Sequence, residues 1–178
     1  MTDGDASLVA RVVAEDDRGA FELLVRRYQS PLRNFLRRLA KNDSARADDL
    51  AQDAFLKAYQ SMHTYMGRAK FSTWLYQIAY HAFLNDQRKR FPQEEFDEAR
   101  HSPPARGPES ADLAADVDRC LGFLSARQRA VFDLHYKKDL SHQEVATALE
   151  LPIGTVKSDL ARGLEIMRRH VEDRSSPK

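Results

Sequence analysis

Cysteine is almost missing from this sequence, whose 178 residues include a single one, Cys120. One cysteine cannot form an internal disulfide, and it has no CxxC partner with which to bind zinc. The stretch His142-Gln143-Glu144 lacks the second histidine that a zinc-protease helix carries four residues further on. Paired carboxylates, a nucleophile with its base and a phosphate-binding loop are missing too. We therefore expect no metal site, no cofactor and no enzyme activity.

Long apolar runs are also missing. The longest extend over a few residues, whereas a helix that crosses a bilayer needs about 20. The first residues, MTDGDASLVARVVAEDD, are acidic and lack the charged and apolar regions of a signal peptide. These features predict a cytoplasmic protein without membrane insertion, built from one medium domain or two small ones.

The net charge of +1 argues against a nucleic-acid-binding protein only until the charge is divided along the chain. Counting Lys and Arg against Asp and Glu, residues 20–90 carry +7 and residues 124–170 carry +2, whereas residues 91–123 carry −5. Binding to phosphate depends on where positive charge gathers, not on its sum. Two basic blocks around an acidic segment are therefore compatible with binding to nucleic acid.

The polar–apolar alternation of strands is absent, and proline gathers in one place. Residues 91–112 are acidic, hold few aliphatic side chains and contain four of the seven prolines, a composition typical of a linker. We expect an all-α protein whose two helical domains are joined by a flexible acidic linker. The predicted boundaries are 1–92 for the first domain, 93–115 for the linker and 116–178 for the second domain.

In the first half, apolar residues recur at spacings of three and four and predict helices over 20–39, 48–62 and 70–90. Pro31 is expected to bend or interrupt the first of these helices. The third helix has two apolar stripes instead of one. The first stripe, expected to face the core, consists of Phe71, Trp74, Leu75, Ile78 and Ala82, and the second of Tyr76, Tyr80 and Phe83.

In the second half, residues 140–169 predict two short helices with a tight turn between them. Ser141 and Glu144 have the spacing of a capping box, and Leu140 and Val145 that of a hydrophobic staple. Pro152 suits the first turn of the following helix. Such a helix-turn-helix would insert its second helix into the DNA major groove, although a plain helical hairpin with solvated charges is the alternative.

The second predicted helix carries side chains suited to DNA. Gly154, Thr155, Ser158 and Ala161 are small enough for a close backbone approach. Lys157 and Arg162 can reach phosphates or guanine edges.

Three segments then resemble one family. LSHQEVATALELPIGTVKSDLARG resembles the −35-reading domain of bacterial sigma factors of the extracytoplasmic-function group within the sigma-70 family. DDLAQDAFLKAY, residues 48–59, resembles the helix with which that family grips the β′ clamp of RNA polymerase. KFSTWLYQIAYHAFLNDQRKR, residues 70–90, resembles its −10-reading and melting helix. The three segments occur in the family's order, and the resemblance covers about residues 10–170.

The resemblance implies three sets of binding residues. Those expected to bind polymerase are Asp49, Gln52, Asp53 and Phe55, although pairing of the acidic residues with a helix dipole is the alternative. Those expected at the −35 element are Ser141, Thr155, Lys157, Ser158, Ala161 and Arg162. Those expected at the −10 element are Tyr65, Arg68, Lys70, Phe71, Trp74, Tyr76, Gln77, Tyr80, His81 and Arg88.

Aromatic faces can compensate for bases that are unstacked when a duplex opens. For Trp74, packing in the core is the favoured alternative. For Tyr76 and Tyr80, contact with DNA and packing in the core are equal alternatives.

Some positions depart from the family's pattern and could change promoter preference. His81 stands where asparagine is common, Asn85 where aspartate is usual, and Gln77 where some members are basic. Asp159 replaces a frequently basic residue, and we expect it to accept a hydrogen bond from a cytosine amine or to repel phosphate.

The resemblance implies a sigma factor that binds core RNA polymerase through the β′ clamp helices and the β flap, reads −35 and −10 elements of promoter DNA and helps to melt the −10 region. It also implies an anti-sigma factor as a partner. A stand-alone repressor or activator and a helical interaction protein that titrates a regulator are the rival interpretations.

Overall fold

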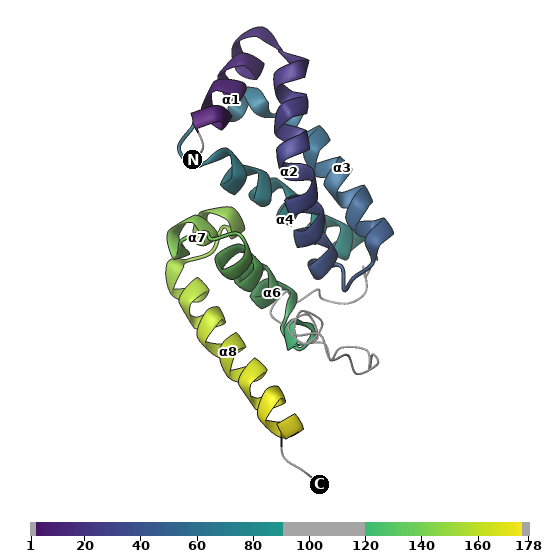
Figure 1. The fold of residues 1–178 in the computed structure, drawn as a ribbon, viewed down its shortest axis with the longest axis vertical. Coiled ribbons are helices and arrows are strands. Elements are labelled where there is room, and N and C mark those ends of the chain that lie inside the picture. Colours follow the sequence, from purple (N-terminus) through teal and green to yellow (C-terminus); the bar gives the residue numbers. More distant parts are fainter. Residues whose placement is uncertain (1–2, 91–119, 176–178) are drawn as a thin grey trace.

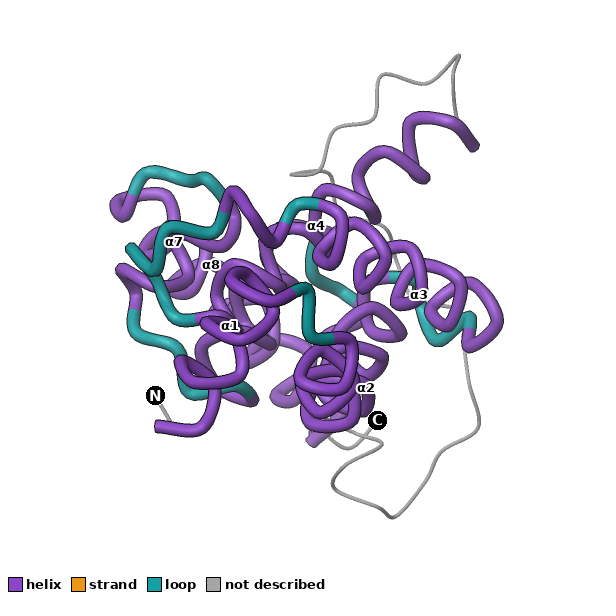
Figure 2. Tube along the Cα trace, turned by 90° about the horizontal axis from the view of Figure 1, so that it is seen from above, coloured by secondary structure: helices purple, strands orange, loops and turns teal. Residues whose placement is uncertain are grey.

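The computed structural model describes residues 3–90 and 120–175, and all regular secondary structure in these two ranges is helical (Figure 1; Figure 2). The prediction of an all-α protein with two helical domains is confirmed. The predicted linker, 93–115, lies outside the described residues. Within the described ranges, no helix combines the length and the apolar character needed to cross a membrane.

The first domain contains α1 (Asp3–Glu15), α2 (Arg18–Leu39), α3 (Ser44–Gln60), a short 3-10 turn (Met62–Thr64) and α4 (Phe71–Arg90). Helices α2 and α3 are antiparallel. Phe21, at the start of α2, lies 4.9 Å from the ring of Tyr59 at the end of α3, and Arg33, further along α2, pairs with Asp48 near the start of α3. Helix α1 was not predicted from the sequence. Its buried Leu8, Val9 and Val12 pack into the same core.

Two local expectations in this domain are corrected. Pro31 does not interrupt α2, which continues to Leu39, and a bend at Pro31 stays a prediction. The loss of one backbone hydrogen bond is offset by packing of the buried Leu32 and Phe35 just beyond it. Helix α3 begins before residue 48, since Asp43 caps it by accepting from the backbone N–H of Arg46 at 3.0 Å.

The second domain contains α6 (Ala126–Phe132), which continues into a π-helical segment (Asp133–Lys137), followed by α7 (His142–Leu149) and α8 (Ile153–Ser175). The predicted capping box of Ser141 and Glu144 is formed, and a second one, Ser125 with Gln128, starts α6. Glu150 ends α7 in the left-handed region, with φ of 53°, and donates its N–H to the last carbonyls of that helix. These features confirm the helix-turn-helix.

The two domains pack against each other, with α4 against α7 and α2 against α6 (Figure 1). Arg38 of α2 pairs with the buried Asp133 at 2.7 Å, and Arg129 of α6 donates to the backbone oxygen of Arg38 at 3.0 Å. Helix α4 is therefore covered on two sides, by the helices of its own domain and by α7.

Candidate nucleic-acid interface

The exposed face at the start of α8 brings together the residues predicted to read a −35 element. Lys157, Ala161 and Arg162 are exposed, and Thr155 and Ser158 are half-buried. The Ser158 hydroxyl donates to the carbonyl of Thr155 at 3.0 Å, which orients its oxygen. The opposite side of the helix is anchored by buried residues, which are Val156, Leu160 and Gly163. A single basic face lined with small side chains is therefore available to DNA.

The prediction that Asp159 contacts DNA is wrong for this structure. Its side chain points into the second domain and is only 1% exposed. The guanidinium of Arg127, on α6, holds its carboxylate, with Nε 2.7 Å from Oδ2. Buried and paired in this way, Asp159 reaches neither cytosine amines nor phosphates.

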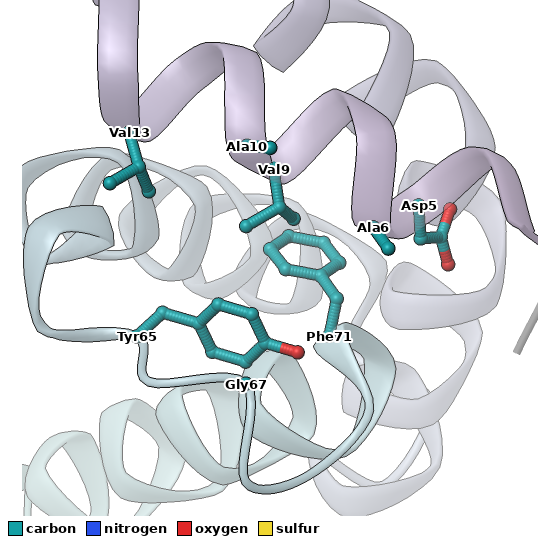
Figure 3. Close-up of a pocket in the computed structure, with 8 residues that line it drawn as sticks. All are labelled: Asp5, Ala6, Val9, Ala10, Val13, Tyr65, Gly67 and Phe71. Atoms are coloured by element: carbon teal, nitrogen blue, oxygen red, sulfur yellow. The ribbon is translucent and has the colours of Figure 1, made fainter.

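A cavity of about 320 Å³ lies between α1 and the loop that precedes α4 (Figure 3). Its walls are aliphatic side chains on α1 and aromatic rings on the loop and on α4. The lining residues are Asp5, Ala6, Val9, Ala10, Val13, Tyr65, Gly67 and Phe71. Gly67 has φ of +69°, a conformation that glycine adopts without strain, and it allows the loop to turn at the edge of the cavity. Two walls of this kind can enclose a flat ring.

Interactions on both sides keep this cavity in shape. The Tyr65 hydroxyl donates to the carbonyl of Ala69 at 2.6 Å, and its ring lies 5.2 Å from that of Trp74. Asp5 accepts hydrogen bonds from Arg27 and from the Tyr28 hydroxyl, which ties α1 to α2. Burial and the Asp5 carboxylate raise the pKa of Tyr28 well above its ordinary value, so that its hydroxyl remains a donor. The contribution of α1 was missed, although its valine and leucine spacing was visible in the sequence.

Three residues predicted to lie at the −10 element are bound by the acidic ends of α7. The ammonium of Lys70 lies 2.7 Å from Glu144. Glu150 accepts from Gln77 at 2.6 Å and lies 3.2 Å from Nε2 of His81. In this closed arrangement the side chains of Lys70 and His81 are still 47% and 46% exposed, but their polar atoms face carboxylates at the ends of α7. Arg68 and Arg88 are exposed as well.

Tyr76 and Tyr80 lie in the interior, 3% and 1% exposed. Tyr76 packs on Phe35 with ring centroids 5.3 Å apart, and Tyr80 on Phe83 at 6.4 Å. Burial and the nearby charge of Asp133 raise the pKa of Tyr76. Of the two alternatives left open by the sequence, the structure supports packing, and both residues are withdrawn from the set expected to contact DNA. Trp74 is half-buried against the core.

The residues predicted to bind polymerase lie along α3. Asp49, Gln52 and Asp53 are exposed, and Phe55 is half-buried against the core. The helix-dipole alternative is wrong because α3 starts at residue 44, which places these carboxylates beyond its first turn. Asp49 and Asp53 line a cleft of about 120 Å³ between α3 and the last turns of α4.

Family models match both domains, sigma-70 region 2 over residues 24–91 and sigma-70 region 4 over residues 114–167. The chain is 30% identical to the ECF RNA polymerase sigma-E factor of Haemophilus influenzae, over 94% of this chain and 95% of that protein. It belongs to the extracytoplasmic-function sigma factors of the sigma-70 family. The RNA polymerase sigma-H factor of Pseudomonas aeruginosa is 32% identical, over 94% of each chain.

Two solved structures are similar to this sigma factor. The sigma factor RpoE in complex with the anti-sigma factor NepR from Bartonella quintana is 25% identical, with a TM-score of 0.69 over 85% of this chain and 96% of that chain. CnrH in complex with the cytosolic domain of CnrY has a TM-score of 0.70 at 22% identity, over 98% of this chain and 100% of that chain, and this likeness concerns the fold.

Proposed function

We propose how this sigma factor divides promoter recognition between its two domains. The chain supports promoter-specific initiation of transcription with RNA polymerase, which supplies the chemistry of RNA synthesis. We place its action in the cytoplasm, and we propose that α8 reads the −35 element while α4 and the preceding loop act at the −10 element. The observation that carries this proposal is the exposed basic face at the start of α8, in a helix-turn-helix in which Val156 and Leu160 on the other side of that helix are buried.

At the −35 element, the first turns of α8 would lie in the major groove. Lys157 and Arg162 would contact phosphates or guanine, while Ala161 and the half-buried Thr155 and Ser158 leave room for the base edges. Ser141, exposed at the N-cap of α7, would face the neighbouring backbone. Each phosphate that is neutralised adds about 0.9 to the slope of log affinity against log salt concentration.

At the −10 element, the cavity between α1 and the loop would hold a base that has left the duplex. Its aliphatic and aromatic walls match the faces of a flat ring, and stacking is worth about 1–3 kcal/mol per base. Arg68 and Arg88 would hold the backbone on either side. Tyr76 and Tyr80 have no direct part in this step because the core encloses them.

Promoter binding requires the α4–α7 contact to open. In the closed arrangement, Glu144 and Glu150 occupy the polar atoms with which Lys70, Gln77 and His81 would contact DNA. We therefore expect the free chain to bind promoter DNA weakly, and core polymerase to strengthen binding by holding the two domains apart.

For polymerase, each domain offers a separate surface. Asp49, Gln52 and Asp53 would form polar contacts with the β′ clamp helices, with Phe55 supporting them from the core. In the second domain, a cavity of about 210 Å³ is lined by apolar side chains and would receive an apolar segment of the β flap. Its apolar lining consists of Leu121, Phe132, Tyr136, Leu164 and Met167. An anti-sigma factor, which the related RpoE binds in its solved complex, would cover these surfaces.

The decisive experiment is transcription in vitro with purified core polymerase, this chain and a library of random promoters. Sigma activity predicts run-off transcripts from a subset that shares −35 and −10 motifs. A stand-alone repressor or activator would instead bind promoters tightly without polymerase. A helical interaction protein would bind its partner and produce no transcript.

A further inference from the structure

Arg127 and Asp159 form a buried ion pair between the first turn of α6 and the recognition helix α8. Two contacts join them, Nε to Oδ2 at 2.7 Å and Nη2 to Oδ1 at 3.4 Å. The Asp159 side chain is 2% exposed and that of Arg127 21% exposed. A fork of this kind restrains the orientation of both groups as well as their separation.

A second contact holds α8 against α6 one turn further along. A Cβ on Gly163 would lie 2.4 Å from Cε2 of Phe132, so the two helices approach each other closely at that point. Asp159 and Gly163 are four residues apart and lie on the same face of α8. Together they determine both how far α8 is rotated about its own axis and how closely it crosses α6.

The pair lies within the segment of α8 proposed to read DNA. Asp159 directly follows Ser158 and lies between Lys157 and Arg162 in sequence. Because successive residues of a helix differ by about 100° in direction, a side chain fixed inward at 159 places Lys157 and Ala161 about 160° away, facing outward. Arg162 lies about 60° from Asp159, at the edge of that outward face, and is exposed. A rotation of α8 would move all of them away from the groove at once.

We infer that Arg127 and Asp159 are positioning residues for −35 recognition, which they support without touching DNA by fixing the rotation of α8. This inference rests on the function proposed for α8. Removing Arg127 leaves the buried carboxylate of Asp159 without its opposite charge, which is strongly unfavourable, whereas exchanging the two residues keeps opposite charges facing each other. A chain with the two residues exchanged should therefore recover the −35-dependent transcription that reversing the charge of either residue alone would lose.

The test uses the full chain assembled with core polymerase and two templates. One is a promoter selected by the wild-type holoenzyme, and the other is the same promoter with its −35 element scrambled. The variants are Asp159→Asn, Asp159→Arg, Arg127→Asp and the exchange Arg127→Asp/Asp159→Arg. The measured quantity is the ratio of run-off transcript from the two templates, together with the thermal midpoint of each chain. Glu165→Gln, which removes a carboxylate from the same helix where it pairs with exposed arginines, is the matched control.

We expect the ratio to fall at least tenfold in each charge reversal, to fall severalfold in Asp159→Asn, and to return to within about threefold of wild type in the exchange. Glu165→Gln should leave it unchanged. A purely stabilising role would lower the thermal midpoint and both transcripts together, leaving the ratio intact, and would overturn the inference. A lowered ratio that the exchange does not recover would also overturn the inference, because it would indicate direct contact with DNA.

If the single reversals do not fold, Asp159→Asn and the exchange decide the matter. If the exchange does not fold either, an unchanged ratio in Asp159→Asn overturns the inference. A wild-type holoenzyme that initiates equally from both templates would contradict the function proposed for α8 itself, an outcome distinct from failure of the pair.

Discussion

Glu150, in the turn of the helix-turn-helix, accepts a hydrogen bond from Gln77 of α4 at 2.6 Å, although the two residues are 73 positions apart. The same carboxylate lies 3.2 Å from the His81 ring, and Glu144 binds Lys70 nearby. We propose that a carboxylate here takes the place that a phosphate would take on α4. The ends of α7 thus occupy part of the surface proposed to act at the −10 element, whereas the basic face of α8 stays exposed.

Neutralising these carboxylates should favour opening. We expect Glu144→Gln/Glu150→Gln to bind a promoter fragment about two- to tenfold more tightly than wild type in the absence of polymerase, since partly exposed pairs contribute about 0.2–1 kcal/mol each. Fluorescence anisotropy at low salt measures this change. Glu165→Gln removes one half-buried carboxylate from the recognition helix and shows what the loss of a single negative charge contributes. Equal affinity of the double variant and wild type would contradict masking by α7.

The stability of the closed chain should depend on pH through Glu144. The hydrogen bond from Lys70 and those from Ser141 lower the pKa of Glu144 below its ordinary value of 4.5. A depressed carboxyl pKa contributes stability above the unfolded value, and that contribution is lost as the pH falls through the folded value. We therefore expect the thermal midpoint of wild type to approach that of Glu144→Gln below about pH 4 and to exceed it at pH 7. Melting curves from pH 3 to 7 measure the difference, and parallel curves would exclude this contribution.

Gly163 should tolerate no side chain. A Cβ at this position would lie 2.4 Å from the ring of Phe132, which is itself buried, so Gly163→Ala is expected to destabilise the second domain by about 1–3 kcal/mol. Gly154→Ala in the first turn of the same helix meets nothing within 4 Å and is the matched control. Because alanine favours helix, the control should be neutral or more stable by up to about 1 kcal/mol. Urea unfolding measures both, and similar midpoints for the two variants would contradict the close approach of α8 to α6.

Filling the cavity between α1 and the loop should block opening of the −10 region. Ala10 is exposed at the edge of this cavity, so Ala10→Phe places a ring where the base is proposed to enter. We expect a loss of at least tenfold in open complexes, measured by permanganate reactivity of unpaired thymines, with unchanged affinity for core polymerase. Ala45→Phe adds the same ring to an exposed position of α3, outside the residues that line the cavity, as a control. Normal opening by Ala10→Phe would exclude the cavity as the site of base capture.

The amino-acid sequence by itself determined α2, α3, α4 and the helix-turn-helix of α7 and α8, the capping box of Ser141 and the order of the two domains, but not α1 or α6. Apolar spacing along α4, the capping box of Ser141 and the break before Pro152 are local, since each depends on residues three or four positions apart. Such local patterns did not predict the start of α3 or the presence of α1, because the apolar pattern is weak in both places. For α3, Asp43 caps a helix whose first turn carries little apolar pattern, and α1 has a short apolar stripe among charged residues.

Only the tertiary structure decided which faces of these helices are available. Asp159 turns inward because Arg127, 32 positions earlier, lies across from it on a neighbouring helix. Tyr76 belongs to the core because the ring of Phe35 on α2 lies 5.3 Å from its own, and Tyr80 is buried beside Phe83. A carboxylate or an aromatic ring has the same periodic signature whether it meets DNA or a packed partner. Its role depends on side chains that come close only when the whole chain folds.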